Sequence, residues 1–106
     1  MDIGYILDCL LKIKESDLYS TAHFELRVRQ RTNNILSDVK GIYSIILKDK
    51  PVGISKQDET KFKLKYNLNA DYDLTIIISN RTLNPISFNL VTCFIEDSNK
   101  RLREDK

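Results

Sequence analysis

The spacing of apolar residues changes near the middle of this chain, at about residue 50, and this change constrains the fold more than any other feature of the sequence. Before that point apolar residues recur every three or four positions, which is the period of a helix with one buried side. After it they alternate with polar residues, which is the period of a strand with one buried face. Helices followed by strands predict an α+β domain whose helices cover one face of an antiparallel sheet.

The first half predicts two or three helices. The first is amphipathic and covers residues 2–15, the second begins after Ser20 or Thr21 as its N-cap, and the third covers at most residues 35–47. Serine and threonine are favoured N-caps because their side-chain oxygen accepts a backbone N–H of the first turn.

The second half predicts four antiparallel strands joined as a meander, at residues 51–55, 61–68, 74–78 and 86–95. The strand at 61–68 alternates most clearly. Its predicted inward residues are Phe62, Leu64, Tyr66 and Leu68, and its predicted outward residues are Lys61, Lys63 and Lys65. The same alternation in the last strand places Thr92 on one face with Leu90 and Phe94. The predicted fold is therefore α+β, with the helices on one face of a four-stranded antiparallel sheet.

Composition limits the expected ligands, the state of the cysteines and the cellular compartment of the protein. The chain has 106 residues and a net charge of +2, so it is only weakly basic, and the charge alone neither requires nor excludes nucleic acid. Cys9 and Cys93 are too few and too far apart for a zinc motif, and no leader precedes the first helix, so we expect reduced thiols and a cytoplasmic protein. We expect no metal, no cofactor and no membrane span. Residues 97–106 are mostly charged and are predicted to form a mobile tail.

The second predicted helix carries a cationic stripe. His23, Arg27 and Arg31 are four residues apart, so their side chains follow one another along one side of the helix. Glu25 and Arg29 form a charge-balanced arc suited to solvent. Two apolar sectors separate these arcs, one with Phe24, Val28 and Ile35 and the other with Ala22 and Leu26.

The stripe suits an anionic ligand. Arginine presents a planar set of donors to phosphate oxygens, and histidine can accept and return a proton near neutral pH. Together they fit metal-independent RNA cleavage by 2′-hydroxyl attack, with His23 as general acid and base and with Arg27 and Arg31 on the phosphate. The same residue types also serve as surface hydrogen-bonding and salt-bridging groups, and this interpretation stays open.

Other residues extend the candidate site. Lys61, Lys63 and Lys65 form a basic platform that suits an RNA backbone, or they keep an exposed strand soluble. Thr92 either aims its hydroxyl at the phosphate or is a β-branched strand residue. Arg81, in a predicted connecting loop, either contacts RNA or is solvated.

The pattern Ser/Thr-x-His-x-x-x-Arg-x-x-x-Arg, followed by an isoleucine and an Asp-Val pair, resembles an uncharacterised bacterial and archaeal family related to RelE/ParE-like toxins. The residues that match it are Thr21, His23, Arg27, Arg31, Ile35, Asp38 and Val39. The resemblance implies a RelE-like domain over residues 1–96, with 2–15 as an extra helix. It also implies metal-independent RNA cleavage by a toxin that an antitoxin holds in check. A glycine usual after the second arginine is replaced by residues 32–34.

Three interpretations of function remain. The first is a RelE-like endoribonuclease with His23, Arg27, Arg31 and Thr92 as its catalytic residues. The second is a non-catalytic relative that binds RNA or a protein through the same surface. The third is a dimeric scaffold whose N-terminal helix carries the interaction. The partners that these interpretations imply are RNA, an antitoxin and a second copy of the chain.

Overall fold

A computed structural model describes residues 2–31 and 39–97 of the chain. The elements, in order, are α1 (Ile3–Lys12), the 3-10 helix η1 (Glu15–Asp17), β1 (Leu18–Tyr19), α2 (Ala22–Arg31), α3 (Val39–Lys48), β2 (Gly53–Lys56), β3 (Lys61–Asn67), β4 (Tyr72–Leu83) and β5 (Ile86–Asp97). The α+β class is confirmed. The predicted start of the third helix, and the predicted tail beyond Asp97, lie outside the described residues.

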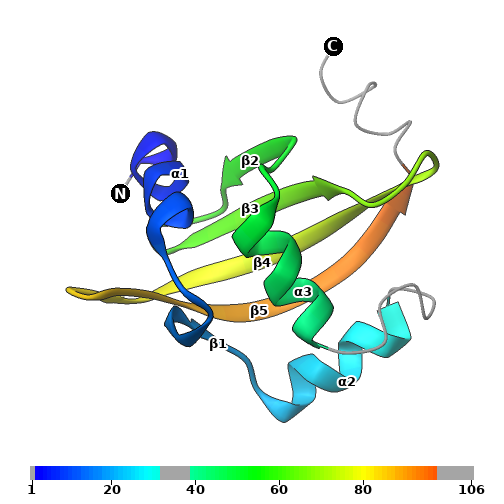
Figure 1. The fold of residues 1–106 in the computed structure, drawn as a ribbon, viewed down its shortest axis with the longest axis horizontal. Helices are drawn as coiled ribbons and strands as arrows, with labels where there is room; N and C mark the ends of the chain where they lie inside the picture. Colours follow the sequence, from blue (N-terminus) through cyan, green and yellow to red (C-terminus); the bar gives the residue numbers. More distant parts are fainter. Residues whose placement is uncertain (1, 32–38, 98–106) are drawn as a thin grey trace.

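The sheet has five strands in the order β1-β5-β4-β3-β2 (Figure 1). Strands β2 to β5 form the predicted antiparallel meander. The prediction of a four-stranded, wholly antiparallel sheet is wrong in one respect, because β1 adds to the edge of β5 in parallel, pairing Leu18 with Phe88 and Tyr19 with Asn89. A strand of two residues has no alternating pattern that the sequence could reveal.

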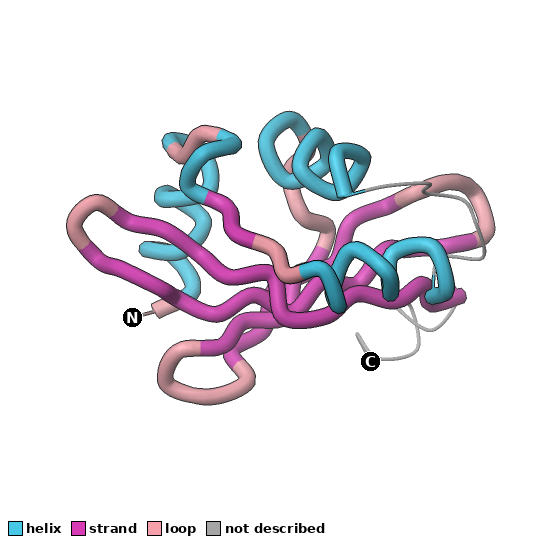
Figure 2. Tube along the Cα trace, turned by 90° about the horizontal axis from the view of Figure 1, so that it is seen from below, coloured by secondary structure: helices cyan, strands magenta, loops and turns pink. Residues whose placement is uncertain are grey.

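The helices occupy two positions relative to the sheet. Helices α1 and α3 contact each other and cover one face, which we call the core face, whereas α2 packs on β5 at the edge of the sheet (Figures 1 and 2). The side chains buried most completely in the core are Phe24, Val28, Ile6, Ile42, Ile46, Phe62, Leu64, Tyr66, Leu74, Ile76, Ile78 and Phe88. The sheet face opposite the core face is called the second face below.

Polar caps fix where the helices begin. The Asp2 carboxylate accepts the Tyr5 N–H at 2.8 Å at the start of α1, and the Thr21 hydroxyl accepts the Phe24 N–H at 3.0 Å at the start of α2. Of the two predicted N-caps, Ser20 and Thr21, it is Thr21 that caps the helix. Helix α1 ends at Lys12 rather than at residue 15, because the Lys14 N–H is donated to Asp17 within η1 instead.

Helix α2 is amphipathic in a simpler way than predicted. Phe24 and Val28 are buried, as expected, but Ala22 and Leu26 are exposed. The second apolar sector therefore does not pack on the fold, because a helix at the edge of the sheet contacts the protein along one side only. The rest of α2 is exposed, except for Arg27 of the cationic stripe, which is half-buried.

A β-bulge in β5 changes which side chains enter the core. Leu90 pairs with Ile78 and Thr92 pairs with Ile77, so Val91 is an additional residue without a partner position. Leu90 and Cys93 are consequently both buried on the core face, whereas Thr92 turns to the second face. The predicted alternation, which placed Thr92 with Leu90, is wrong from this bulge onward.

Two tyrosines that pack in or against the core differ in whether their hydroxyl is hydrogen-bonded. Tyr66 is fully buried, and its hydroxyl has no hydrogen-bond partner in the part of the chain that the structure describes. Burial, and then the Asp49 charge, raise the pKa of Tyr66 far above its usual value. The Tyr43 hydroxyl instead shares a hydrogen bond with Ser20 at 2.8 Å, which joins α3 to the segment before α2.

We predict that Tyr66→Phe leaves the free energy of unfolding within about 0.5 kcal/mol of the original or raises it, because it removes an unpaired buried hydroxyl. The matched variant Tyr43→Phe should cost about 1 kcal/mol, since Ser20 loses its partner. Urea unfolding of both variants measures the difference. An equal or larger loss for Tyr66→Phe would contradict the assigned packing.

Candidate functional site

The cationic stripe of α2 is accessible. His23 and Arg31 are exposed and Arg27 is half-buried on the helix that the Thr21 cap begins. Among residues 2–31 and 39–97, neither Arg27 nor Arg31 forms an ion pair with a carboxylate. Their two guanidinium groups are about 6 Å apart along the helix axis, a spacing that suits two contacts to one anionic ligand.

Arg31 connects this stripe to the sheet. Its Nη1 donates a hydrogen bond to Thr92 Oγ1 at 3.1 Å, joining the last turn of α2 to the middle of β5. The structure thus brings together two of the four residues that the sequence nominated as catalytic. His23 lies at the other end of the helix, about 12 Å from Arg31 along the axis, so it is not part of this contact.

Arg31 also influences the buried thiol of Cys93. Burial raises this pKa to about 11, and the Arg31 guanidinium opposes the rise because it favours the thiolate. Cys93 follows Thr92 and points into the core. Arg31 therefore contacts a residue of the second face, while its charge also acts on a residue of the core face.

The pairing register places lysines of β3 on the second face, in line with the residue that Arg31 contacts. Lys63 pairs with Ile77, and Ile77 pairs with Thr92, so one row of side chains leads from β3 to Arg31. The neighbouring row consists of Lys61, Ser79, Asn89 and Tyr19. Partners in register point to the same side of a sheet, so both rows belong to one surface.

Arg81 lies at the end of the second row. It is an extra residue in β4, between positions paired with Phe88 and Ser87, and not in a connecting loop as predicted. Its guanidinium carbon stacks over the Tyr19 ring at 3.8 Å from the centroid. This cation–π contact holds an exposed arginine against an aromatic ring that is itself 43% exposed.

Lys65 differs from the other two lysines of β3. The residue is only 7% exposed, and its ammonium lies 3.8 Å from the Glu96 carboxylate. Glu96 also accepts a hydrogen bond from the Thr75 hydroxyl, with 2.6 Å between the two oxygens. The expectation that Lys65 stands open to solvent is wrong, because Glu96 on β5 compensates its charge. The cationic part of the second face consists of Lys61, Lys63, Arg31 and Arg81, and these four residues with Arg27 are called the cationic surface below.

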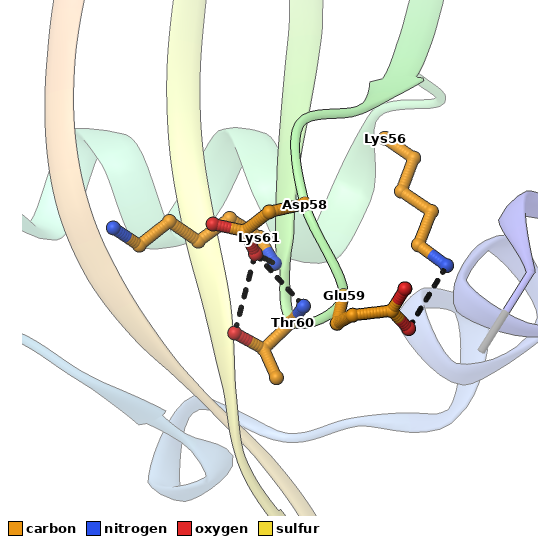
Figure 3. A network of polar contacts seen from close by, with 5 residues as sticks. All are labelled: Lys56, Asp58, Glu59, Thr60 and Lys61. Atoms are coloured by element: carbon orange, nitrogen blue, oxygen red, sulfur yellow. Dashed lines mark hydrogen bonds and ion pairs between the residues drawn. The ribbon is translucent and has the colours of Figure 1, made fainter.

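In the turn between β2 and β3, the carboxylates of Asp58 and Glu59 each interact with neighbouring residues (Figure 3). Asp58 accepts the N–H groups of Thr60 and Lys61, both at 2.9 Å, and the Thr60 hydrogen bond is the main cause of its lowered pKa. Glu59 lies 3.8 Å from Lys56. Figure 3 shows the Lys61 side chain extending away from the turn, and its positive charge also contributes to the lowered pKa of Asp58.

The described residues contain no group of three or more metal-ligating side chains close enough to hold a metal ion. None of the described helices is both long and apolar enough to cross a membrane. The described side chains of the site can donate hydrogen bonds and supply positive charge from arginine and lysine, and His23 lies exposed at the start of α2.

These features define a class: a small α+β protein with helices on a mixed sheet and a cationic surface that joins a helix to the second sheet face. A family model described as the MJ0788 family matches residues 4–78, and the chain belongs to this family. The matched range includes His23, Arg27 and Arg31 but ends before Arg81 and Thr92.

A relative supports the same assignment. The chain is 39% identical over 66 residues to the uncharacterised protein MJ0788 of Methanocaldococcus jannaschii, an alignment that covers 62% of this chain and 81% of the relative. The expected membership in an uncharacterised prokaryotic family is confirmed at this level. No solved structure matches the chain.

The contact between Arg31 and β5 can be tested through Cys93. Arg31→Ala should raise the Cys93 pKa further above 11, because it removes the charge that favours the thiolate. The measurement is the pH dependence of the Cys93 Cβ chemical shift, which follows this thiol separately from Cys9 and from the five tyrosines of the chain. Arg29→Ala, on the charge-balanced arc, is the control and should leave the titration where it was. An unchanged midpoint in Arg31→Ala would place Arg31 away from Cys93.

Proposed function

We propose that this protein acts on RNA, binding the phosphate backbone on the cationic surface and cleaving it without metal, with His23 as general acid and base. The observation that carries the proposal is the position of Arg31, which is exposed, unpaired by any described carboxylate and fixed by Thr92 between α2 and the second face. An RNA strand that contacts Arg27 and Arg31 can continue over Lys63 and Lys61.

Residue chemistry supports RNA as the ligand. Arginine and lysine side chains neutralise phosphates and release counterions, and the exposed Tyr19 ring offers a stacking surface for a base beside Arg81. Kinship with RelE/ParE-like toxins, and control by an antitoxin, belong to the same proposal and rest on the resemblance of the α2 motif.

Binding is tested by the salt dependence of affinity for a single-stranded RNA oligonucleotide. Each phosphate neutralised contributes about 0.7 to the slope of log K against log salt. Arg31→Gln should therefore weaken binding and reduce this slope by about 0.7. The control Lys12→Gln removes an exposed positive charge from α1, away from the cationic surface, and should leave the slope unchanged. Equal slopes in all three proteins would contradict the proposal.

Cleavage is tested with purified protein in the presence of a chelator. His23→Ala should reduce the cleavage rate by about 100-fold or more while RNA affinity stays within about threefold, because a general acid and base acts mainly in the transition state. Glu25→Ala, on the solvent arc of the same helix, is the matched control. If His23→Ala cleaves as fast as the original protein, His23 has no catalytic role.

A non-catalytic RNA-binding protein is the second candidate. It is favoured by the exposure of His23 and by its separation of about 12 Å from Arg31 along the helix axis, since catalytic groups act within hydrogen-bonding reach of the reacting atoms. The two experiments separate the candidates. Salt-dependent binding without any cleavage supports the second candidate, whereas cleavage that depends on His23 supports the first.

A further inference from the structure

Arg81 and Tyr19 form a stack of two flat groups at the β1 edge of the second face. The Arg81 guanidinium carbon lies 3.8 Å from the centroid of the Tyr19 ring, a distance at which the two groups are in contact. Both residues are nevertheless exposed, and Arg81 forms no ion pair with a carboxylate of residues 2–31 and 39–97. The stack therefore leaves a flat, positively charged surface open to solvent.

The backbone on both sides of the stack is held by the fold. Tyr19 pairs with Asn89 in the short strand β1, and the next residue, Ser20, shares a hydrogen bond with the Tyr43 hydroxyl at 2.8 Å. Arg81 is the extra residue at a register shift in β4, which takes its side chain out of the regular pleat and onto the ring. A ligand that adds to the stack does not have to order these two side chains first.

Cations that suit phosphates lie at defined distances from the stack. Lys61 belongs to the same row as Tyr19 and is three strands away, which is about 14 Å at the usual strand spacing. The row that holds Lys63 and the Arg31 partner Thr92 is about 7 Å away along the strands. A strand whose phosphates contact these cations therefore passes close to the stack.

A nucleobase is the ligand whose chemistry fits this stack. Every base has a flat face that stacks on aromatic rings and on guanidinium planes, whichever base it is. In a duplex these faces are covered by the neighbouring pairs, so only a base that has left the helix can reach the stack. The exposed Asn89 side chain, which has no hydrogen bond to another described residue, lies one strand from Tyr19 and can bond to the edge of a base.

We propose that the Tyr19–Arg81 stack is a subsite for one unpaired nucleobase, which makes single-stranded RNA the substrate class of the protein. The inference rests on the proposed binding of RNA to the cationic surface and adds a contact to a base. Tyr19 comes four residues before His23, so chain length alone keeps their Cα atoms within about 14 Å. The stacked base therefore belongs to a nucleotide close to the histidine end of α2.

The test compares the affinity of the full chain for three probes of equal length: a 2′-O-methyl RNA single strand, its duplex, and a single strand of abasic residues. None of them has a free 2′-hydroxyl, so cleavage cannot interfere with the measurement. The original protein should bind the single strand at least about fivefold more tightly than the abasic chain, because stacking of one base contributes that much or more. Tyr19→Ala should remove this difference and leave its affinities for the duplex and the abasic chain unchanged.

Three further variants separate stacking from charge and from folding. Arg81→Lys keeps the positive charge but loses the flat group, so it should weaken single-strand binding without changing the salt dependence, and it serves if Tyr19→Ala disturbs β1. Tyr19→Phe keeps the ring and should bind as the original does. The matched control is Tyr72→Ala: Tyr72 is 38% exposed against 43% for Tyr19, but it lies about 30 Å from Arg81 along β4 and should not affect binding.

The outcomes distinguish this inference from the proposed function. If the original protein shows no salt-dependent binding of any probe, both are wrong. Salt-dependent binding with equal affinity for the single strand and the abasic chain would overturn the subsite alone. The same holds if Tyr19→Ala and Arg81→Lys bind the single strand as tightly as the original, or if they weaken all three probes equally.

Discussion

The structure depends on burying one face of the long β4–β5 hairpin. Leu74, Ile76 and Ile78 of β4 are all fully buried on the core face, under the layer that α1 and α3 form. Because side chains alternate along a strand, this burial sends every second residue of β4 to the second face. The core therefore determines which residues the protein presents on both surfaces of the sheet.

The bulge at Val91 gives the second face its link to α2. It keeps Leu90 and Cys93 in the core while turning Thr92 outward, and Thr92 accepts the hydrogen bond from Arg31. The face is divided by charge: the rows through Lys61 and Lys63 carry no carboxylate, whereas Lys65 is compensated by Glu96. The proposed function places phosphate binding on the part of this face that lacks carboxylates.

Local patterns predicted the elements well. The alternation of β3, the inward position of Tyr66 and the Thr21 cap all depend on residues close together in sequence, where period and hydrogen-bonding chemistry apply directly. Strand β1, the two bulges and the Lys65–Glu96 pair were missed, because each depends on how distant segments align. The stripe of α2 was identified from the spacing of its residues. Its contact with Thr92 could not be predicted, because Thr92 reaches the second face only through the bulge at Val91, and no sequence pattern predicts that bulge.

The most direct test of the account is the set of backbone amide NMR shifts that a short single-stranded RNA perturbs. We predict shifts at Arg27, Arg31 and Thr92, and at Lys61 and Lys63 on the same surface, with little change around Leu11. Perturbations confined to α1 and α3, or no perturbation at low salt, would contradict the claim that the surface joining α2 to the second sheet face binds RNA.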